Sequence, residues 1–180
     1  NGRQVSVEKN EKPKAPAAKP AEQPKLPQPV NNTPAPQEKT VAPEKVNGMN
    51  VFVLDPYTIP YKSAYSPFTS RPVYENNKTK FILARPGDTY QKLAASMQMK
   101  EQDLRQYNDV YDGSEPIEDE VVYIEMKKTK SSVPYHSLQE GDTYRYIAQK
   151  YAIQLKILIK RNSGNLNSYG IGDQICIGCN

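Results

Sequence analysis

Two apolar runs and two helical stripes follow one another in the middle of the chain. The consecutive apolar residues 81–83 are typical of a short buried strand. The next apolar residues recur at i, i+3, i+4 and i+7, the spacing of one helix face: Tyr90, Leu93, Ala94 and Met97. A second helix is predicted from Lys100, with Leu104 on its inner face, and the run 121–124 predicts a closing strand. The predicted order is β-α-α-β.

The same pattern returns 54 residues further on, without a gap. Gly-Asp-Thr-Tyr occurs at 87–90 and again at 141–144, and the second helical stripe consists of Tyr144, Ile147, Ala148 and Tyr151. A repeat of this kind defines the architecture, and two copies are too few for a solenoid. We therefore predict an α+β protein with two small β-α-α-β modules at 80–126 and 134–178. Each module should form its own small domain, with a two-stranded antiparallel sheet and both helices on one face.

Polar residues mark the ends of the predicted helices. Asp88 is a good N-cap for the first helix, and Gln91 three residues later completes something close to a capping box. Asn108 and Asn162 fall where the second helix of each module should end. Asparagine suits a left-handed cap at that position, so both residues are expected to be structural.

The chain before the modules has a different composition. Residues 1–47 contain nine of the 16 prolines and no aromatic residue, so they cannot bury enough apolar surface to offset their ordering entropy. We predict a disordered linker rich in Pro, Ala and Lys, which acts either as a tether or as a passive spacer. Residues 48–79 combine X-Pro steps with tyrosines, which predicts an extended lead-in whose tyrosines pack on the following module.

Charge and hydropathy narrow the function classes. The net charge is +4, yet residues 80–126 carry 5 basic and 10 acidic side chains, which argues against binding to nucleic acid. No run approaches the roughly 20 apolar residues that cross a bilayer, so we predict no membrane span. Separately, we expect a monomer. The chain opens without Met or a signal-peptide pattern, so we expect a fragment or processed product whose export signal lies elsewhere.

Few residues could support chemistry. Cys176 and Cys179 are too few for a disulfide framework, and a Cys-x-x-Cys pair is compatible with a redox or metal half-site, with two surface thiols or with a terminal disulfide. The single histidine, His136, has no nucleophile motif beside it and is expected at the surface or a strand edge. We therefore predict no catalytic residue, no metal site and no cofactor.

The repeated residues resemble the LysM domain, the lysin motif of proteins that bind cell walls. The resemblance rests on Gly-Asp-Thr-Tyr, the Leu/Ile-Ala pair in the first helix, the asparagine after the second helix and the closing segment 171–177. It covers about half of the chain, and the second copy is closer, because Glu118 replaces the glycine found at 172. The proline-rich spacer before two such modules resembles the C-terminal tail of bacterial peptidoglycan hydrolases of the N-acetylglucosaminidase type.

The resemblance implies binding to peptidoglycan or to chitin-like N-acetylglucosamine oligomers. In the family the glycan lies in a shallow groove between the strand-to-helix loop and the loop after the second helix. Carried over by position, the glycan-binding residues are Gly87, Asp88, Thr89, Tyr90, Tyr111, Ile117, Gly141, Asp142, Thr143, Tyr144, Gly164, Asn165, Leu166 and Ile171. For the two aspartates a capping role is the stronger alternative, and the two tyrosines can equally be core residues.

Two functions follow from this resemblance. The first is a non-catalytic region that targets an attached cell-wall hydrolase to its substrate, in the cell envelope or outside the cell. The second is an envelope adaptor whose repeats bind glycan weakly or not at all, which the acidic first module favours. The second module should bind more strongly, because its helices carry Lys150, Lys156, Lys160 and Arg161 and envelope polymers are often anionic.

Overall fold

The computed structural model describes residues 2, 44–46, 49–163 and 166–179. Every described helix and strand belongs to the unit Lys39–Asn180. Most of the predicted linker therefore lies outside the described residues. Within the described part of the chain, no helix has the length and apolar character needed to cross a bilayer.

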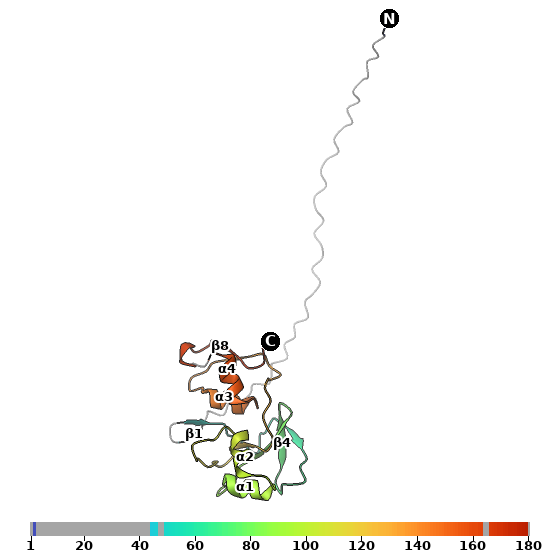
Figure 1. Cartoon of the computed structure of the whole chain (residues 1–180), viewed down its shortest axis with the longest axis vertical. Helices are drawn as coiled ribbons and strands as arrows, with labels where there is room; N and C mark the ends of the chain where they lie inside the picture. The colour runs from blue at the N-terminus through green and yellow to red at the C-terminus, as the bar shows by residue number, and fades with distance from the viewer. Residues whose placement is uncertain (1, 3–43, 47–48, 164–165, 180) are drawn as a thin grey trace. The chain divides into compact units, whose positions relative to one another are not determined.

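The first module has the predicted order of elements. It consists of β5 (Thr79–Leu83), α1 (Tyr90–Ser96), α2 (Glu101–Tyr107) and β6 (Val121–Tyr123), and its helices are seen in Figure 1. β5 and β6 pair antiparallel, with Ile82 opposite Val122. The predicted α+β class and the predicted strand pair are confirmed.

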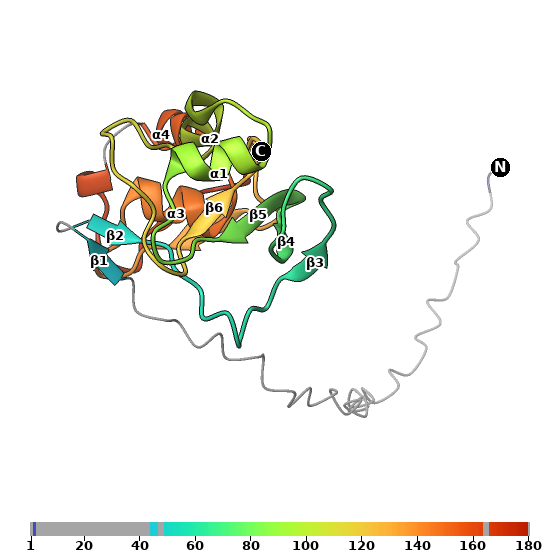
Figure 2. The same ribbon diagram turned by 90° about the horizontal axis from the view of Figure 1, so that it is seen from below.

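The lead-in adds strands to this pair. β3 (Lys62–Ala64) and β4 (Val73–Asn76) extend it to a four-stranded antiparallel sheet in the order β3-β4-β5-β6, which Figure 2 shows from below. Further upstream, β1 (Glu44–Val46) pairs antiparallel with β2 (Met49–Val51). The sheet of the first module is thus wider than the predicted pair, because the lead-in supplies two more strands.

Only some lead-in tyrosines pack on the module. The rings of Tyr61 and Tyr74 lie 5.3 Å and 5.5 Å from the ring of Phe81. Tyr57 and Tyr65 are 95% and 80% exposed, so for them the expected packing is wrong. Tyr74 lies on β4, but Tyr61 packs although it lies outside the strands, as Tyr57 and Tyr65 do.

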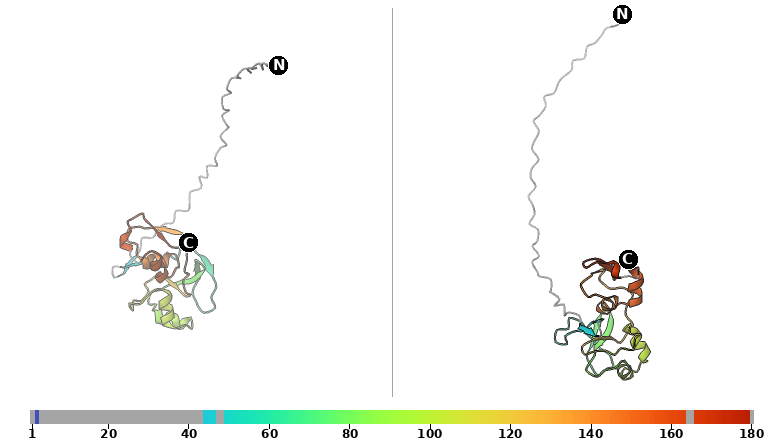
Figure 3. Two further views of the ribbon diagram at one scale, coloured as in Figure 1. Left: turned by 45° about the horizontal axis from the view of Figure 1, so that its top comes forward. Right: turned by 90° about the vertical axis from the view of Figure 1, so that its left-hand side faces the viewer.

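The second module is built in the same way. It consists of β7 (Tyr135–Ser137), α3 (Tyr144–Lys150), α4 (Leu155–Arg161), the short 3₁₀ helix η1 (Leu166–Ser168) and β8 (Gln174–Cys176). β7 and β8 form the predicted two-stranded antiparallel sheet, with His136 opposite Ile175. Figure 3 gives two further views of both modules.

The sheet of the first module is covered on both faces. Side chains alternate across a strand, so neighbouring residues point to opposite faces. Ile82 and Val122 belong to the apolar cluster that includes the helices of their own module. Phe81 and Tyr123 belong to another cluster, which also contains Ile147 and the rest of the second module's core. One core is therefore shared between the modules through one face of this sheet, and the helices of the first module cover a second core on the other face.

Buried polar groups join the modules as well. The Tyr123 hydroxyl donates to the backbone carbonyl of Gln149 at 2.6 Å and accepts from the Asn76 amide at 2.9 Å. The Lys127 ammonium pairs with the Asp109 carboxylate and donates to the Gln149 side-chain oxygen. Lys127 is 2% exposed, so the connector between the modules (residues 127–133) contributes a charged side chain to the buried interface.

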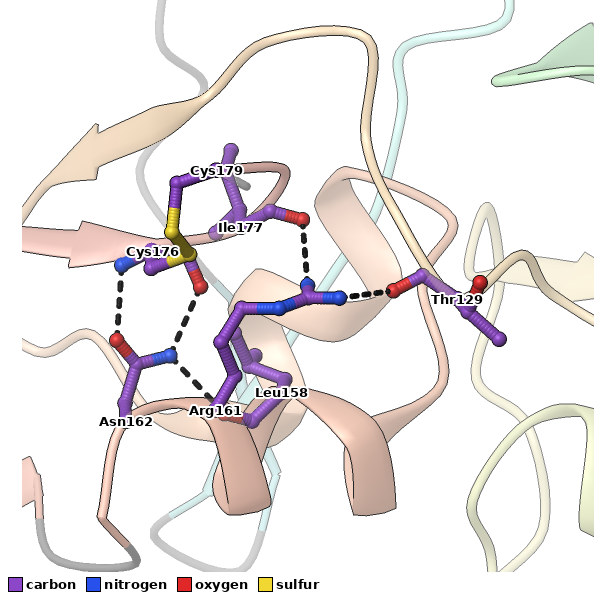
Figure 4. The surroundings of a disulfide bond; sticks show 7 residues. All are labelled: Thr129, Leu158, Arg161, Asn162, Cys176, Ile177 and Cys179. Atoms are coloured by element: carbon purple, nitrogen blue, oxygen red, sulfur yellow. Dashed lines mark hydrogen bonds between the residues drawn. A yellow bond between two sulfur atoms is a disulfide. The ribbon is translucent and has the colours of Figure 1, made fainter.

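The C-terminal end of the second module is held by a disulfide. Cys176 and Cys179 are bonded, with Cα atoms 5.5 Å apart, so the terminal-disulfide alternative is the one that the structure adopts. Figure 4 shows Arg161 beside it, donating to the carbonyl of Ile177 at 3.1 Å and to that of Thr129 at 2.9 Å. Helix α4 thereby connects the closing strand to the connector.

Gly178 occupies a position without room for a side chain. Its N–H donates to the carbonyl of Pro134 at 2.9 Å. A Cβ atom on residue 178 would lie 2.5 Å from the carbonyl oxygen of Val133 and still closer to that of Ser131. The C-terminal segment can approach the connector this closely because residue 178 is glycine.

Candidate functional site

The strand-to-helix loops of the two modules have the same geometry. Gly87 and Gly141 have φ angles of 78° and 83°, in the left-handed region that glycine adopts without strain. The following aspartates close each turn: Asp88 accepts from the N–H of Arg85 at 2.7 Å, and Asp142 accepts from the N–H of Gln139 at 2.8 Å. Gly-Asp is thus repeated because it builds the turn.

The predicted N-cap at Asp88 is wrong by one residue. Thr89 and Thr143 have extended backbones and cap the helices, accepting from the N–H of Lys92 at 3.2 Å and of Tyr146 at 3.0 Å. The aspartate side chain is already engaged with the turn, so the hydroxyl that follows it is left to cap. The threonine of the motif therefore has a structural role in both copies.

Each turn aspartate has a cationic or ionisable partner from elsewhere in the fold. Arg71 of the lead-in makes a two-pronged contact with Asp88, at 2.5 Å and 3.2 Å. Burial by itself raises the pKa of Asp88, but the hydrogen bonds from Arg71 and from the Arg85 backbone outweigh it, so the pKa is lowered. In the second module His136 Nε2 lies 2.7 Å from Asp142.

The surface position that the sequence suggested for His136 is wrong, because the side chain is buried. It is 4% exposed, and its Nδ1 lies 2.9 Å from the hydroxyl of Tyr151. The central residue of β7 points into the module, because both neighbours in the strand are exposed and alternation requires the opposite face for His136. Asp142 supplies the polar partner that a buried imidazole needs.

The asparagines after the second helices are structural, as expected. Asn108 donates to the carbonyls of Leu104 and Tyr123, and its side-chain oxygen accepts from the Tyr123 N–H at 2.7 Å. Asn162 makes the equivalent contacts in the second module. The predicted left-handed conformation is wrong for both asparagines and belongs to the next residue, with φ of 56° at Asp109 and 61° at Ser163.

Much of the loop after α2 is exposed in the first module, at residues 111–113, 115 and 118. Tyr111 is 77% exposed, and Ile117 is half-buried. A hollow of about 500 Å³ lies beside the loop and contains none of the predicted site residues except Tyr111; its lining consists of Glu101, Gln102, Arg105, Gln106, Val110 and Tyr111. The hollow follows the side of α2, next to the predicted groove.

The predicted groove of the first module contains an ion pair. The Glu115 carboxylate accepts from the backbone N–H of Tyr90 at 2.7 Å, and its second oxygen accepts from Arg105 at 2.5 Å. Arg105 also donates to the carbonyl of Ser114 and lies 4.8 Å from the centre of the Tyr90 ring. Tyr90 is 1% exposed, and burial raises the pKa of its hydroxyl, so its ring is a core residue.

The second module differs at the same positions. Tyr144 is half-buried, and its hydroxyl donates to the carbonyl of Asn162 at 3.3 Å, to which Tyr169 also donates at 3.4 Å. Burial, and then the neighbouring Tyr169, raise the pKa of Tyr144. Leu166 is half-buried on η1, and Ile171 is 76% exposed. Gly164 and Asn165, also predicted to bind glycan, lie outside the described residues.

Sequence reasoning missed the contacts that cross the loops. Arg105 and Glu115 are separated by ten residues, and Arg71 reaches Asp88 across 17 residues. The one available signal was the repeat itself. In gapless register Arg105 aligns with Ile159 and Glu115 with Tyr169, so two charged residues of the first copy correspond to two uncharged residues of the second.

The family model of the LysM domain matches residues 84–118 and 136–178, and so confirms the resemblance for both modules. LysM is a binding domain for carbohydrate of the peptidoglycan type, not a catalytic one. Among the curated proteins, none matches the sequence.

Solved structures that are similar to part of the chain include two spore cortex-lytic enzymes. The spore cortex-lytic enzyme SleL of Bacillus cereus is 21% identical over 55% of this chain and 22% of that one, with a TM-score of 0.24. SleL of Bacillus megaterium QM B1551 is 14% identical over 56% of this chain and 22% of that one, with a TM-score of 0.23. The chain thus spans less than a quarter of the length of either enzyme.

Proposed function

We propose that this chain is a non-catalytic region that binds the N-acetylglucosamine-containing glycan of peptidoglycan and holds an attached cell-wall hydrolase on its substrate. The observation that carries the proposal is the match of both modules to a carbohydrate-binding domain, together with a strand-to-helix loop of the same geometry in each. The proposed location is the cell envelope or the cell exterior, where such glycan occurs.

The second module offers the better surface for an N-acetyl group. Such a group presents a methyl, a carbonyl and an amide, so its site needs small apolar contacts next to polar backbone groups. Ile171 is 76% exposed without a core role, and Leu166 lies on the 3₁₀ helix of the same loop. Opposite them in the proposed groove is the loop 141–144, whose shape is fixed by the turn aspartate.

Co-sedimentation with purified, protein-free cell-wall sacculi tests the proposal. The whole chain should be enriched in the pellet relative to an unrelated protein of similar charge. Ile171→Ala should weaken binding about tenfold, because it removes apolar contact area without disturbing the core. Tyr57→Ala is the matched control, since it removes a fully exposed aromatic ring outside the modules. Equal sedimentation of the chain and the unrelated protein would contradict glycan binding.

The hydrolase part of the proposal has its own measurement. The chain should release no soluble glycan from sacculi, because the proposal assigns cleavage to an attached domain. A fusion of the chain to a muramidase or glucosaminidase domain should cleave sacculi faster than that domain alone. The gain should disappear when excess free chain competes for the wall. A fusion no faster than the free catalytic domain would argue against targeting.

A second function is favoured by the charge of the first module. Residues 80–126 carry 10 acidic and 5 basic side chains, whereas residues 134–178 carry 3 acidic and 5 basic ones. Such a surface suits a basic protein of the envelope, with the repeats acting as an adaptor. The adaptor function gains if chito-oligosaccharides shift no NMR signal around residues 141–144. A saturable shift there supports glycan binding instead.

A further inference from the structure

The two loops beside the predicted groove of the first module are tied together by one side chain. Glu115 belongs to the loop after α2, and its carboxylate accepts from the Tyr90 N–H, where the other loop enters α1, at 2.7 Å. Arg105 holds the second carboxylate oxygen at 2.5 Å. A carboxylate oxygen on a backbone N–H uses the same donor that an N-acetyl carbonyl would use.

Arg105 keeps this carboxylate in place. Its guanidinium makes three directed contacts: with Glu115, with the carboxylate of Glu101 at 2.7 Å and with the carbonyl of Ser114 at 2.7 Å. The same group lies 4.8 Å from the centre of the buried Tyr90 ring. The loop is therefore fixed at two adjacent residues, which limits how far Glu115 can move aside.

The second module lacks this arrangement. The residues in the positions of Arg105 and Glu115 are Ile159 and Tyr169, neither of which carries a charge. Tyr169 directs its hydroxyl to the carbonyl of Asn162. The counterpart of the Tyr90 N–H is the Tyr144 N–H, and no side chain of the described residues accepts a hydrogen bond from it.

We infer that Glu115, positioned by Arg105, closes the glycan groove of the first module, so that the chain binds glycan through its second module alone. The inference rests on the proposed function and deepens it. Closure is an internal competition, because a glycan must displace a charge-assisted hydrogen bond before it can use the Tyr90 N–H. The pair thus decides which of the two repeats takes the ligand.

Glu115→Ala opens the groove while leaving the fold in place. The Glu115 side chain is 40% exposed, and after its removal Arg105 retains Glu101 and the Ser114 carbonyl. Glu118→Ala is the matched control, since it removes an equal charge from an exposed position in the same loop. Both variants are made in the whole chain, and their folding is compared by amide NMR spectra.

The experiment has one readout without glycan and one with it. Amide hydrogen exchange at Tyr90 should speed up about tenfold or more in Glu115→Ala and stay unchanged in Glu118→Ala. Titration with the N-acetylglucosamine tetramer should shift signals around 141–144 in the wild type and in Glu118→Ala. In Glu115→Ala, signals around 87–89 should shift as well, and calorimetry should report two sites per chain in place of one.

The outcomes separate this inference from the proposed function. Shifts around 141–144 alone, in the wild type and in Glu115→Ala alike, leave glycan binding standing and overturn closure by Glu115. Two sites in the wild type overturn it too, as does unchanged exchange at Tyr90 in Glu115→Ala. No shift in either module of any variant defeats the proposed function and, with it, the role of Glu115 in glycan selection.

Discussion

Removal of the Tyr123 hydroxyl allows the coupling between the modules to be measured. Tyr123 lies on β6 of the first module and is completely buried. Its hydroxyl donates to the carbonyl of Gln149 on α3 at 2.6 Å and accepts from Asn76 on β4 at 2.9 Å. Tyr123→Phe removes this hydroxyl and leaves the ring, so apolar packing between the modules is retained.

The expected loss of stability is about 2 kcal/mol. A buried polar group that is left without a hydrogen-bond partner costs roughly 1–3 kcal/mol. In Tyr123→Phe two groups lose the hydroxyl as a partner, the Gln149 carbonyl and the Asn76 amide. Each of them keeps a second contact, however: Asn76 still donates to the carbonyl of Lys150 at 2.9 Å, and the Gln149 carbonyl still accepts from Ala152 at 3.3 Å. The combined cost therefore lies within the range for one unsatisfied group, which corresponds to a fall in Tm of about 4–8 °C.

Urea denaturation followed at one probe in each module measures this loss. The methyl signals of Leu104 and Leu158 are suitable, because both side chains are fully buried, one in each module. Since the modules share a core, both probes should report one transition, and Tyr123→Phe should move both by the same amount. Tyr57→Phe, at a 95% exposed position, should change stability by less than about 0.5 kcal/mol. A shift confined to the Leu104 probe would refute the coupling.

Three further predictions concern the interface and the C-terminal end. Burial lowers the pKa of Lys127 from 10.5 to about 8, so above pH 8 the unfolded chain binds more protons than the folded one. Stability from urea titrations should therefore rise between pH 8 and 10 in the wild type and stay flatter in Lys127→Met. Gly178→Ala should cost about 2 kcal/mol in thermal unfolding, because its Cβ would meet two backbone carbonyls; a cost under 0.5 kcal/mol would contradict that contact. Cys179→Ser should cost about 2 kcal/mol, the value for a loop closed across a separation of three residues, and should abolish the effect of a reductant on Tm.

The parts of the fold that the sequence predicts are those that depend on local spacing. All four side chains of the stripe Tyr90, Leu93, Ala94 and Met97 are buried, because helical geometry brings the first three onto one face of α1 and Met97 follows as its C-cap. The repeat likewise predicted a closing strand at the end of each module. Both asparagines were expected to be structural as left-handed caps. They are structural for another reason, because their side chains bind backbone groups of the preceding helix and the closing strand.

The sequence also contained a sign that both faces of the first sheet are covered, although only one covered face was predicted. Residues 81–83 and 121–123 are unbroken apolar runs, which are typical of strands covered on both sides. In the second module, by contrast, Tyr135 and Ser137 are exposed and His136 alone is buried, the alternation of a strand covered on one side. The unbroken runs therefore carried the information that another layer packs on the first sheet.

The charged contacts across the groove could not be predicted from spacing. Residues 80–126 contain 10 acidic and 5 basic side chains, so many pairings are compatible with the sequence. Which of them forms depends on where the loop after α2 lies, and that position is decided by tertiary packing. Glu115 and Glu118 illustrate the point, because one carboxylate contacts Arg105 and the Tyr90 N–H while the other, three residues on, is exposed.

The shared core changes how two repeats can act on one polymer. A flexible connector would let each module find its own glycan segment, and avidity would then depend on connector length. Here the connector is hydrogen-bonded to the second module at two points, through Lys128 to Ala152 and Gln154 and through Ser131 to Ile177. Under the proposed closure of the first groove by Glu115, the first module would contribute rigidity, and its sheet would support the surface that we propose for glycan binding on the second module.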